Sequence, residues 1–183
     1  MKACFFVEGA SGVGKTTLIE SLKGKYCEGL RIKIVDEVAR ILIKHGVSYG
    51  VKTKEMDYFI YLYAYINNFR LAEGEIVFFD RSIIDVIVYS RIALGKGNPI
   101  ELVAFEFLHY IRKQVSGVIY IPIEFPLIAD GIRSGDLNQQ RLFDSELHSL
   151  LIHEIDIPVY EVRGSTIERE EKIFSIIKKI VAG

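Results

Sequence analysis

The amino-acid sequence predicts an α/β fold, in which a parallel β-sheet is covered by helices on both faces. Two observations predict it. Apolar stretches of strand length alternate with segments of helical apolar spacing along the 183 residues, and the connections between them are short. The first strand and the first helix are joined by a glycine-rich loop near the N-terminus. Ligands of such sheets bind at the carboxyl ends of the strands, so we expect the functional residues along that edge.

The first half of the chain contains three of the five expected strands. Residues 3–7 and 76–79 are continuous apolar runs, which predicts buried strands. Residues 31–35 alternate polar and apolar side chains, as a half-buried strand does. Apolar residues at helical spacing predict three helices, and Thr53 stands where a cap for the third helix is expected. These helices are expected at residues 16–22, 38–44 and 54–72.

The second half of the chain adds two strands and four helices. Ser82 is positioned to cap a helix directly after the third strand, and Ser165 with Glu168 matches the capping box of the last helix. The expected strands are residues 117–121 and 158–162. The expected helices are residues 83–94, a segment that ends near residue 114, residues 137–153 and residues 166–181. Because no repeat or low-complexity linker interrupts this alternation, we expect one domain over residues 1–183.

Composition and charge exclude several classes of protein. Half of the residues are apolar and 26% are charged, which is typical of a globular protein rather than a disordered one. The net charge is −1 and the isoelectric point is about 6.4, so the basic footprint of a nucleic-acid-binding protein is missing. No apolar run reaches the length of a signal peptide or of a membrane span. We therefore expect a cytoplasmic protein that does not insert into membranes.

The glycine-rich loop matches the phosphate-binding pattern G-x-x-x-x-G-K-[ST] and lies between a strand and a helix, as that pattern requires. Its glycines allow successive backbone N–H groups to turn toward phosphate oxygens, and the following helix N-terminus favours an anion. Lys15 is expected to reach the β- and γ-phosphates of ATP, and the Thr16 hydroxyl to ligate the accompanying Mg²⁺. The residues expected to bind the nucleotide are Gly9, Ala10, Ser11, Gly12, Val13, Gly14, Lys15, Thr16 and Thr17.

Charged residues follow the second and third strands. Asp80 ends the third strand and complements Thr16 as a Mg²⁺ ligand, directly or through water. Glu37 follows the second strand, and we favour it as the base that takes a proton from an attacking hydroxyl, with Asp80 as the rival base and a purely structural role as the third alternative. Arg81 is expected either to clamp the acceptor or transferring phosphoryl group or to form a structural ion pair. Arg40 could reach the same pocket, but we interpret it as a solvated helix arginine.

The segment of residues 126–142 is predicted to form a lid, because Arg133 lies between Gly131 and Gly135, which permit movement. Arg141 follows eight residues later, about two helical turns along, and so lies on roughly the same face. Arginines that close over a nucleotide stabilise the negative charge of phosphoryl transfer, which makes both arginines candidate catalytic residues. Surface arginines without a role in catalysis are the alternative.

The helix expected at residues 54–72 is rich in tyrosine and phenylalanine. Most of these aromatic side chains must pack in the core, but we expect Tyr61 or Tyr65 to touch a planar ring of the acceptor. The apolar surface of this helix could also bury a homodimer face, although a role in the core suffices to explain it.

In their order along the chain, these motifs resemble those of the P-loop kinase superfamily. The chain is similar to the small AAA-type, kinase-like ATPase domains that include nicotinamide riboside kinase modules, most closely between residues 130 and 158. The triplet Asp80-Arg81-Ser82 is similar to the acid-Arg-Ser signature of deoxynucleoside kinases and to the Asp-Arg pair of thymidylate kinases.

The resemblance implies a three-layer P-loop NTPase fold, with a five-stranded parallel sheet in the order 2-3-1-4-5. It implies that Glu37 is the base and that Asp80 and Arg81 form the acid–arginine pair. It also implies that Arg133 and Arg141 are the arginines of the lid.

Three functions are consistent with this sequence. The leading hypothesis is ATP- and Mg²⁺-dependent phosphoryl transfer to a hydroxyl or phosphate of a small molecule, with a nucleoside or nucleotide as the acceptor. The second is a nucleotide-driven regulatory ATPase that acts with a protein partner. The third is a kinase of polynucleotide ends, against which the near-neutral charge argues.

Overall fold

Six strands form one sheet in the order β2-β3-β4-β1-β5-β6. The computed structural model describes residues 1–50, 53–124 and 137–182. Neighbouring strands from β3 to β6 in this order pair in parallel, and β2 pairs antiparallel with β3. The strands are β1 (Ala3–Glu8), β2 (Tyr26–Cys27), β3 (Leu30–Val35), β4 (Ile76–Asp80), β5 (Gly117–Tyr120) and β6 (Val159–Glu161).

The predicted α/β fold and strand order are confirmed for the five parallel strands, whereas the predicted number of strands is wrong. Counted along the chain without β2, the parallel strands follow the order 2-3-1-4-5. The additional strand, β2, contains only Tyr26 and Cys27 and lies at the edge of the sheet. Two residues are too few to show the alternation that marks a strand, so the sequence offered no signal for it.

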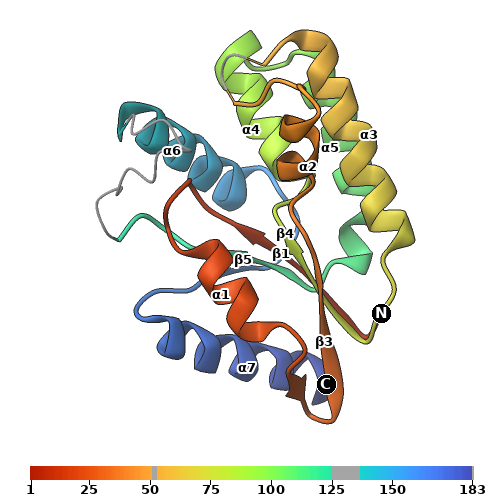
Figure 1. The fold of residues 1–183 in the computed structure, drawn as a ribbon, viewed down its shortest axis with the longest axis vertical. Coiled ribbons are helices and arrows are strands. Elements are labelled where there is room, and N and C mark those ends of the chain that lie inside the picture. The colour runs from red at the N-terminus through yellow and green to blue at the C-terminus, as the bar shows by residue number, and fades with distance from the viewer. Residues whose placement is uncertain (51–52, 125–136, 183) are drawn as a thin grey trace.

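Helices cover both faces of the sheet (Figure 1). Helices α1 and α7 pack together on one face, α3, α4 and α5 pack on the other, and α6 packs against α4. The helices are α1 (Lys15–Leu22), α2 (Val38–Lys44), α3 (Glu55–Leu71), α4 (Ile83–Leu94), α5 (Pro99–Ile111), α6 (Leu137–His153) and α7 (Thr166–Ala182), with a 3₁₀ turn η1 (Arg112–Gln114) after α5. Among the described residues, no helix is both long enough and apolar enough to cross a membrane.

The two central strands bring the functional segments to one edge of the sheet. Every residue of β1 and β4 is buried, and Phe5 stacks on Phe78 with ring centroids 4.9 Å apart. The ladder pairs Val7 with Asp80, so β1 and β4 end at the same level. Because β3 runs parallel to β4, the segments that follow β1, β3 and β4 leave the sheet at the same edge.

Side chains cap α4 and α7 as predicted. The Ser82 hydroxyl accepts a hydrogen bond from the backbone N–H of Ile84 at 3.1 Å. At the start of α7, the Glu168 carboxylate accepts a hydrogen bond from the backbone N–H of Ser165 at 2.7 Å, and the Ser165 hydroxyl accepts one from the backbone N–H of Glu168 at 3.4 Å. These contacts satisfy N–H groups that the first helical turns leave unpaired.

The predicted cap at Thr53 is wrong. Helix α3 begins at Glu55, and its N-cap is Lys54, which makes no side-chain hydrogen bond to the helix. The Thr53 hydroxyl instead donates to the carbonyl oxygen of Gly50 at 2.6 Å, within the turn that precedes the helix. A threonine can stabilise a turn or a helix with the same hydroxyl, and its position in the sequence does not distinguish the two.

The predicted lid lies only partly within the described residues. Arg133 falls in the range 125–136, which lies outside them. Residues 137–142 form the start of α6, where Arg141 is exposed. The assignment of the lid and that of a single domain over residues 1–183 therefore stay predictions.

Candidate functional site

The phosphate-binding loop connects β1 to α1, and its backbone requires glycine. The φ angles of Gly9, Gly12 and Gly14 are +152°, +83° and +88°, which residues with a side chain rarely adopt. A Cβ atom at Gly9 would also lie 2.4 Å from the carbonyl oxygen of Ile121, directly after β5. The glycines of the motif are therefore explained by the shape of the loop and by its close approach to the neighbouring strand.

Lys15 is buried against the loop, and its side chain is only 6% exposed. Its Nζ donates hydrogen bonds to the carbonyl oxygens of Gly9 and Ala10, both at 2.6 Å. Burial and the nearby charge of Arg81 lower the pKa of Lys15 to about 7, against the opposing effect of nearby carboxylates. A phosphate group at the loop would favour the charged form of Lys15 and would compete with the two carbonyl oxygens for its ammonium group.

Two side chains from distant helices hold the loop, and sequence reasoning missed both. Gln140 of α6 donates to the carbonyl oxygen of Ser11 at 2.6 Å. Arg169 of α7 donates to the carbonyl oxygen of Val13 at 2.7 Å and pairs with Glu124 at 2.6 Å. The partners in the two loop contacts are 129 and 156 residues apart, so no local pattern of the sequence could have joined them.

Arg81 joins Glu37, the candidate base, to the buried carboxylate of Asp85. Its Nε lies 3.0 Å from Oε1 of Glu37, as an ion pair without hydrogen-bond alignment. Its Nη1 donates to Oδ2 of Asp85 at 2.6 Å. Arg81 has a φ angle of +68°, which is uncommon for a residue with a side chain, and it is 5% exposed. Arg81 thus forms ion pairs with two carboxylates, and its expected role as a clamp on the acceptor or the phosphoryl group stays a prediction.

Arg40 links Glu37 to the phosphate-binding loop. Its Nε donates to Oε2 of Glu37 at 2.8 Å, and its Nη2 donates to the hydroxyl oxygen of Thr16 at 2.7 Å. The side chain of Arg40 is 48% exposed. The interpretation of Arg40 as a solvated helix arginine is therefore incomplete, because its guanidinium group contacts two residues of the site.

The surrounding charges give the two candidate bases different proton affinities. Burial alone would raise the pKa of Glu37, but Arg81 and Arg40 outweigh it and hold that pKa below its ordinary value. Burial and the nearby carboxylate of Glu37 raise the pKa of Asp80, against the effect of Arg81 and Lys15. Glu37 is therefore ionised at neutral pH, and Asp80 binds its proton more tightly than an ordinary aspartate does.

Glu8 is a fully buried carboxyl group that sequence reasoning missed. It is the last residue of β1, and its Oε1 accepts a hydrogen bond from the Ser82 hydroxyl at 2.6 Å. Among the described residues, no donor reaches Oε2 of Glu8 or Oδ1 of Asp85. Burial, and after it the nearby negative charge of Asp85, raises the pKa of Glu8 well above its ordinary value. The position of an acidic residue at the end of an apolar strand is the sequence signal that could have identified Glu8 as a candidate site residue.

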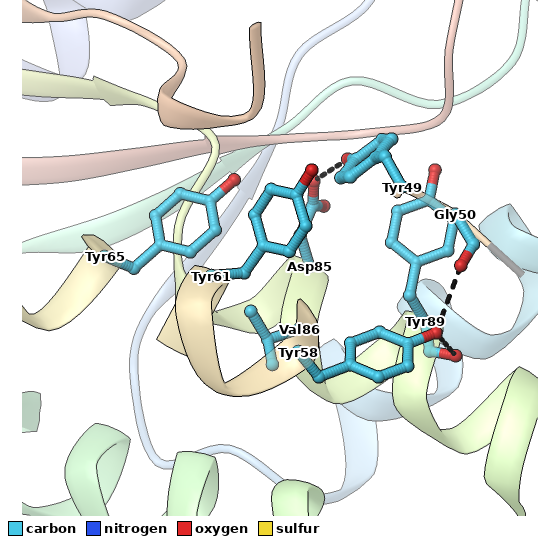
Figure 2. A pocket seen from close by; sticks show the side chains of 8 residues that line it. All are labelled: Tyr49, Gly50, Tyr58, Tyr61, Tyr65, Asp85, Val86 and Tyr89. Atoms are coloured by element: carbon cyan, nitrogen blue, oxygen red, sulfur yellow. Dashed lines mark hydrogen bonds between the residues drawn. The ribbon is translucent and has the colours of Figure 1, made fainter. Parts of the chain in front are cut away.

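A pocket lined mainly by tyrosines lies beside this charged cluster (Figure 2). The Tyr49 hydroxyl donates to Oδ2 of Asp85 at 2.9 Å. Among the described residues, the buried hydroxyls of Tyr61 and Tyr65 have no hydrogen-bond partner, and Figure 2 shows them pointing in the same direction. We call this site the tyrosine pocket, and its lining residues are Tyr49, Gly50, Tyr58, Tyr61, Tyr65, Asp85, Val86 and Tyr89.

The tyrosine pocket offers aromatic faces and unpaired oxygen atoms to a ligand. Its cavity measures about 10 Å³, room for about one water molecule, so a planar ring would have to part the tyrosine side chains. No lysine or arginine lines it within the part of the chain that the structure describes. The expected contact of Tyr61 or Tyr65 with an acceptor stays a prediction, and both residues line this pocket.

Thr16 and Asp80 carry oxygen atoms of the kind that ligates Mg²⁺, and in this structure the Thr16 hydroxyl accepts a hydrogen bond from Arg40. Mg²⁺ is typically held by one or two protein oxygens and completes its shell with water and substrate phosphates. In the described ranges, no cluster of three or more His, Cys, Asp or Glu side chains is arranged to hold a metal by itself. Thr16 and Asp80 are accordingly candidates to share such an ion with phosphate groups.

Comparison with known proteins gives a family match over most of the chain. A family model described as an AAA domain matches residues 4–169. No curated protein sequence matches the chain.

Solved structures of similar fold extend this result. A crystal structure of NadR protein in complex with NR has a TM-score of 0.70 and 20% identity, over 99% of this chain and 52% of that one. NadR in complex with NAD and AMP-PNP has a TM-score of 0.64 and 18% identity, over 99% and 50%. Deoxyadenosine kinase from M. mycoides, with the products dCMP and a flexible dCDP, has a TM-score of 0.68 and 16% identity, over 97% and 99%.

The present chain thus spans about half the length of the two NadR chains and nearly all of the deoxyadenosine kinase chain. At these identities the likeness establishes the fold, which is that of a P-loop kinase-like domain. The resemblance seen in the sequence motifs is thereby confirmed at the level of fold.

Proposed function

This chain belongs to the AAA-domain family, and on that premise we propose that it is a kinase that transfers the γ-phosphoryl group of ATP to a hydroxyl of a nucleoside. One observation carries the proposal. Glu37 stands in an unbroken series of contacts between the phosphate-binding loop and the tyrosine pocket, so a carboxylate lies between the loop that would bind ATP and the pocket proposed for the acceptor. The series runs Thr16, Arg40, Glu37, Arg81, Asp85 and Tyr49.

In this mechanism, Lys15 leaves the carbonyl oxygens of Gly9 and Ala10 and binds the β- and γ-phosphates. The N–H groups of the glycine loop bind the remaining phosphate oxygens. Arg141, with Arg133 as the second lid arginine, is proposed to add positive charge near the γ-phosphoryl group. Thr16 and Asp80 would hold a Mg²⁺ ion, which supplies neutralisation of the phosphate charge.

We assign the role of base to Glu37 rather than to Asp80. Glu37 is ionised and held by two arginines, so its carboxylate can accept a proton from the acceptor hydroxyl without rotating away. Asp80 has the higher proton affinity, but the oxygen atoms it would need as a base are those proposed for the metal. We therefore choose Glu37 because of the groups that surround the two carboxylates, and not because of their pKa values.

The lining of the tyrosine pocket favours a nucleoside over a nucleoside monophosphate. Tyrosine faces stack on planar rings, and the unpaired oxygens of Tyr61, Tyr65 and Asp85 suit hydroxyl or amide groups. A phosphate on the acceptor would need a cation there, and none of the described lining residues is basic. The nearby Arg81 is already paired with two carboxylates. The NR of one NadR complex and the nucleotide products of deoxyadenosine kinase suggest which rings to try.

A coupled assay of ADP release tests this proposal. Mg·ATP is supplied with nicotinamide riboside, each deoxynucleoside and each ribonucleoside, and the matching 5′-monophosphates serve as controls. We expect one nucleoside to raise ADP release and to gain the mass of one phosphate, while the monophosphates are inert. A monophosphate that reacts while its nucleoside does not would overturn the choice of acceptor. Slow ATP hydrolysis that no acceptor changes would overturn the kinase proposal in favour of a regulatory ATPase.

A further inference from the structure

Arg40 bridges the candidate Mg²⁺ ligand, Thr16, and the candidate base, Glu37. Its guanidinium group donates to the Thr16 hydroxyl, the candidate Mg²⁺ ligand, at 2.7 Å and to the Glu37 carboxylate, the candidate base, at 2.8 Å. Transfer to a hydroxyl places the γ-phosphoryl group between the metal at Thr16 and the attacking oxygen at Glu37. Arg40 already spans these two points.

The contact between Arg40 and Thr16 is incompatible with a metal ion on the same hydroxyl. A divalent cation and a guanidinium group that share one oxygen would stand a few ångströms apart and repel each other. The nitrogen that donates to Thr16 must therefore leave when a metal-bound nucleotide arrives.

Arg40 is free to make that exchange, in contrast to its neighbour Arg81. Its side chain is 48% exposed and projects from the first turn of the seven-residue helix α2, so a rotation costs little packing. Arg81 is 5% exposed and is tied to Glu37 and Asp85 by ion pairs. The exposed guanidinium group of Arg40 can therefore reorient toward a phosphoryl group, whereas that of Arg81 is held by its two carboxylate partners.

We propose that Arg40 is a catalytic residue, which holds Thr16 and Glu37 together before Mg·ATP binds and then moves from the Thr16 hydroxyl onto the oxygens of the γ-phosphoryl group. The proposal rests on the proposed kinase function for the place of the acceptor, but its binding step does not require an acceptor. The exchange replaces a hydrogen bond to a neutral hydroxyl with a charge-assisted one to phosphate, which favours nucleotides that carry a γ-phosphate.

Calorimetric titration with Mg·AMP-PNP and with Mg·ADP tests this step without turnover. In Arg40→Met, we expect the affinity for Mg·AMP-PNP to fall by about 10- to 100-fold, the range of one charge-assisted hydrogen bond. The affinity for Mg·ADP should stay the same or rise, because no contact with Thr16 has to be broken. Lys44→Met is the matched control, since it removes one positive charge from an exposed site on the same helix. It should leave the affinities for both nucleotides unchanged.

The results separate this inference from the kinase proposal. Equal affinities of Arg40→Met and wild type for Mg·AMP-PNP, or an equal loss of affinity for both nucleotides, would overturn the role of Arg40 even if an acceptor is phosphorylated. A selective loss for Mg·AMP-PNP would support it even if no acceptor is found. Thermal unfolding of each variant checks that a lost affinity does not reflect a lost fold. A selective loss of affinity for Mg·AMP-PNP in Lys44→Met as well would also overturn the proposal, since it would show that any lost positive charge on this helix has the same effect.

Discussion

Glu37 carries its negative charge between two guanidinium groups, and this arrangement defines what its substitution should do. Glu37→Gln keeps the shape of the side chain but cannot accept a proton, so turnover should fall by about 10²- to 10⁴-fold. The affinity for Mg·ATP should stay within about threefold of wild type, since among the described residues Glu37 contacts the phosphate-binding loop through Arg40 and not directly. Steady-state kinetics and nucleotide titration measure the two quantities separately.

Lys15→Ala is the matched comparison for Glu37→Gln. It removes the ammonium group proposed to bind the β- and γ-phosphates, so both nucleotide binding and transfer should be lost. Normal turnover in Glu37→Gln would show that another group takes the proton, and Asp80→Asn would then be the next variant to measure.

Glu8 makes the stability of the fold depend on pH. Its pKa in the folded protein is well above the ordinary value because the side chain is buried beside Asp85, so unfolding releases its proton at any pH between the two pKa values. The free energy of unfolding therefore falls as the pH rises from about 4.5 toward the folded pKa, by about 1.4 kcal/mol per pH unit for one proton. The contribution of Glu8 to stability is largest in acid and is lost as the pH increases.

Glu8→Gln should remove this dependence, because glutamine resembles the protonated acid and can keep the hydrogen bond from Ser82. Urea unfolding between pH 5 and pH 8 should give the variant a shallower loss of stability than wild type, with the gap in its favour growing as the pH rises. Parallel pH profiles for the two proteins would mean that Glu8 is ionised in the folded state. Glu8→Leu, which has no polar group for Ser82, serves as the control for a lost hydrogen bond.

At the scale of elements, α3 packs in the core and also contributes Tyr58, Tyr61 and Tyr65 to the lining of the tyrosine pocket. The hydroxyl of Tyr65 is buried and has no hydrogen-bond partner among the described residues, which lowers the stability of the fold. A bound acceptor could supply the missing hydrogen bond. Tyr65→Phe should therefore leave the free energy of unfolding unchanged or slightly higher. The KM for the acceptor should rise by about 2- to 12-fold, the range of one neutral hydrogen bond, while the KM for ATP stays constant.

Denaturant unfolding and two-substrate kinetics on Tyr65→Phe measure these effects, with Tyr63→Phe as the control. Tyr63 lies on the same helix but is 71% exposed and away from the tyrosine pocket. A loss of stability in Tyr65→Phe with no change in the acceptor KM would assign the hydroxyl to the fold rather than to the ligand.

Elements with a local signal could be predicted from the sequence, and contacts between distant elements could not. The loop at residues 9–16 and the cap at Ser82 depend on neighbours a few residues away, so both could be predicted from local sequence patterns. Strand β2 is too short to show an alternating pattern. The Thr53 hydroxyl could either cap a helix or stabilise the preceding turn, and the sequence does not distinguish these two roles. The hydrogen bond from Ser82 to Glu8 and the electrostatic effect of Asp85 on Glu8 join residues up to 77 positions apart, so no local pattern could have predicted them.

At the scale of the whole molecule, the parallel sheet gathers the site from segments spread along the chain. The order of the parallel strands brings β1 between β4 and β5, so the phosphate-binding loop has Arg81 on one side and the segment after β5 on the other. The strand order followed from the resemblance in motifs, but the partners of Arg40 and Arg81 depend on side-chain rotamers that no motif encodes. A homodimer stays a prediction, although α3 presents the exposed apolar side chains of Met56 and Tyr63.

The central claim is that the γ-phosphoryl group passes from ATP to an acceptor bound in the tyrosine pocket. A single-turnover reaction with excess protein over γ-labelled Mg·ATP, with and without the nucleoside that stimulates ADP release, tests it most directly. The account predicts that the label enters the nucleoside at the rate at which it leaves ATP, and that little is released without acceptor. Release of the label as inorganic phosphate at the same rate in both reactions would contradict it.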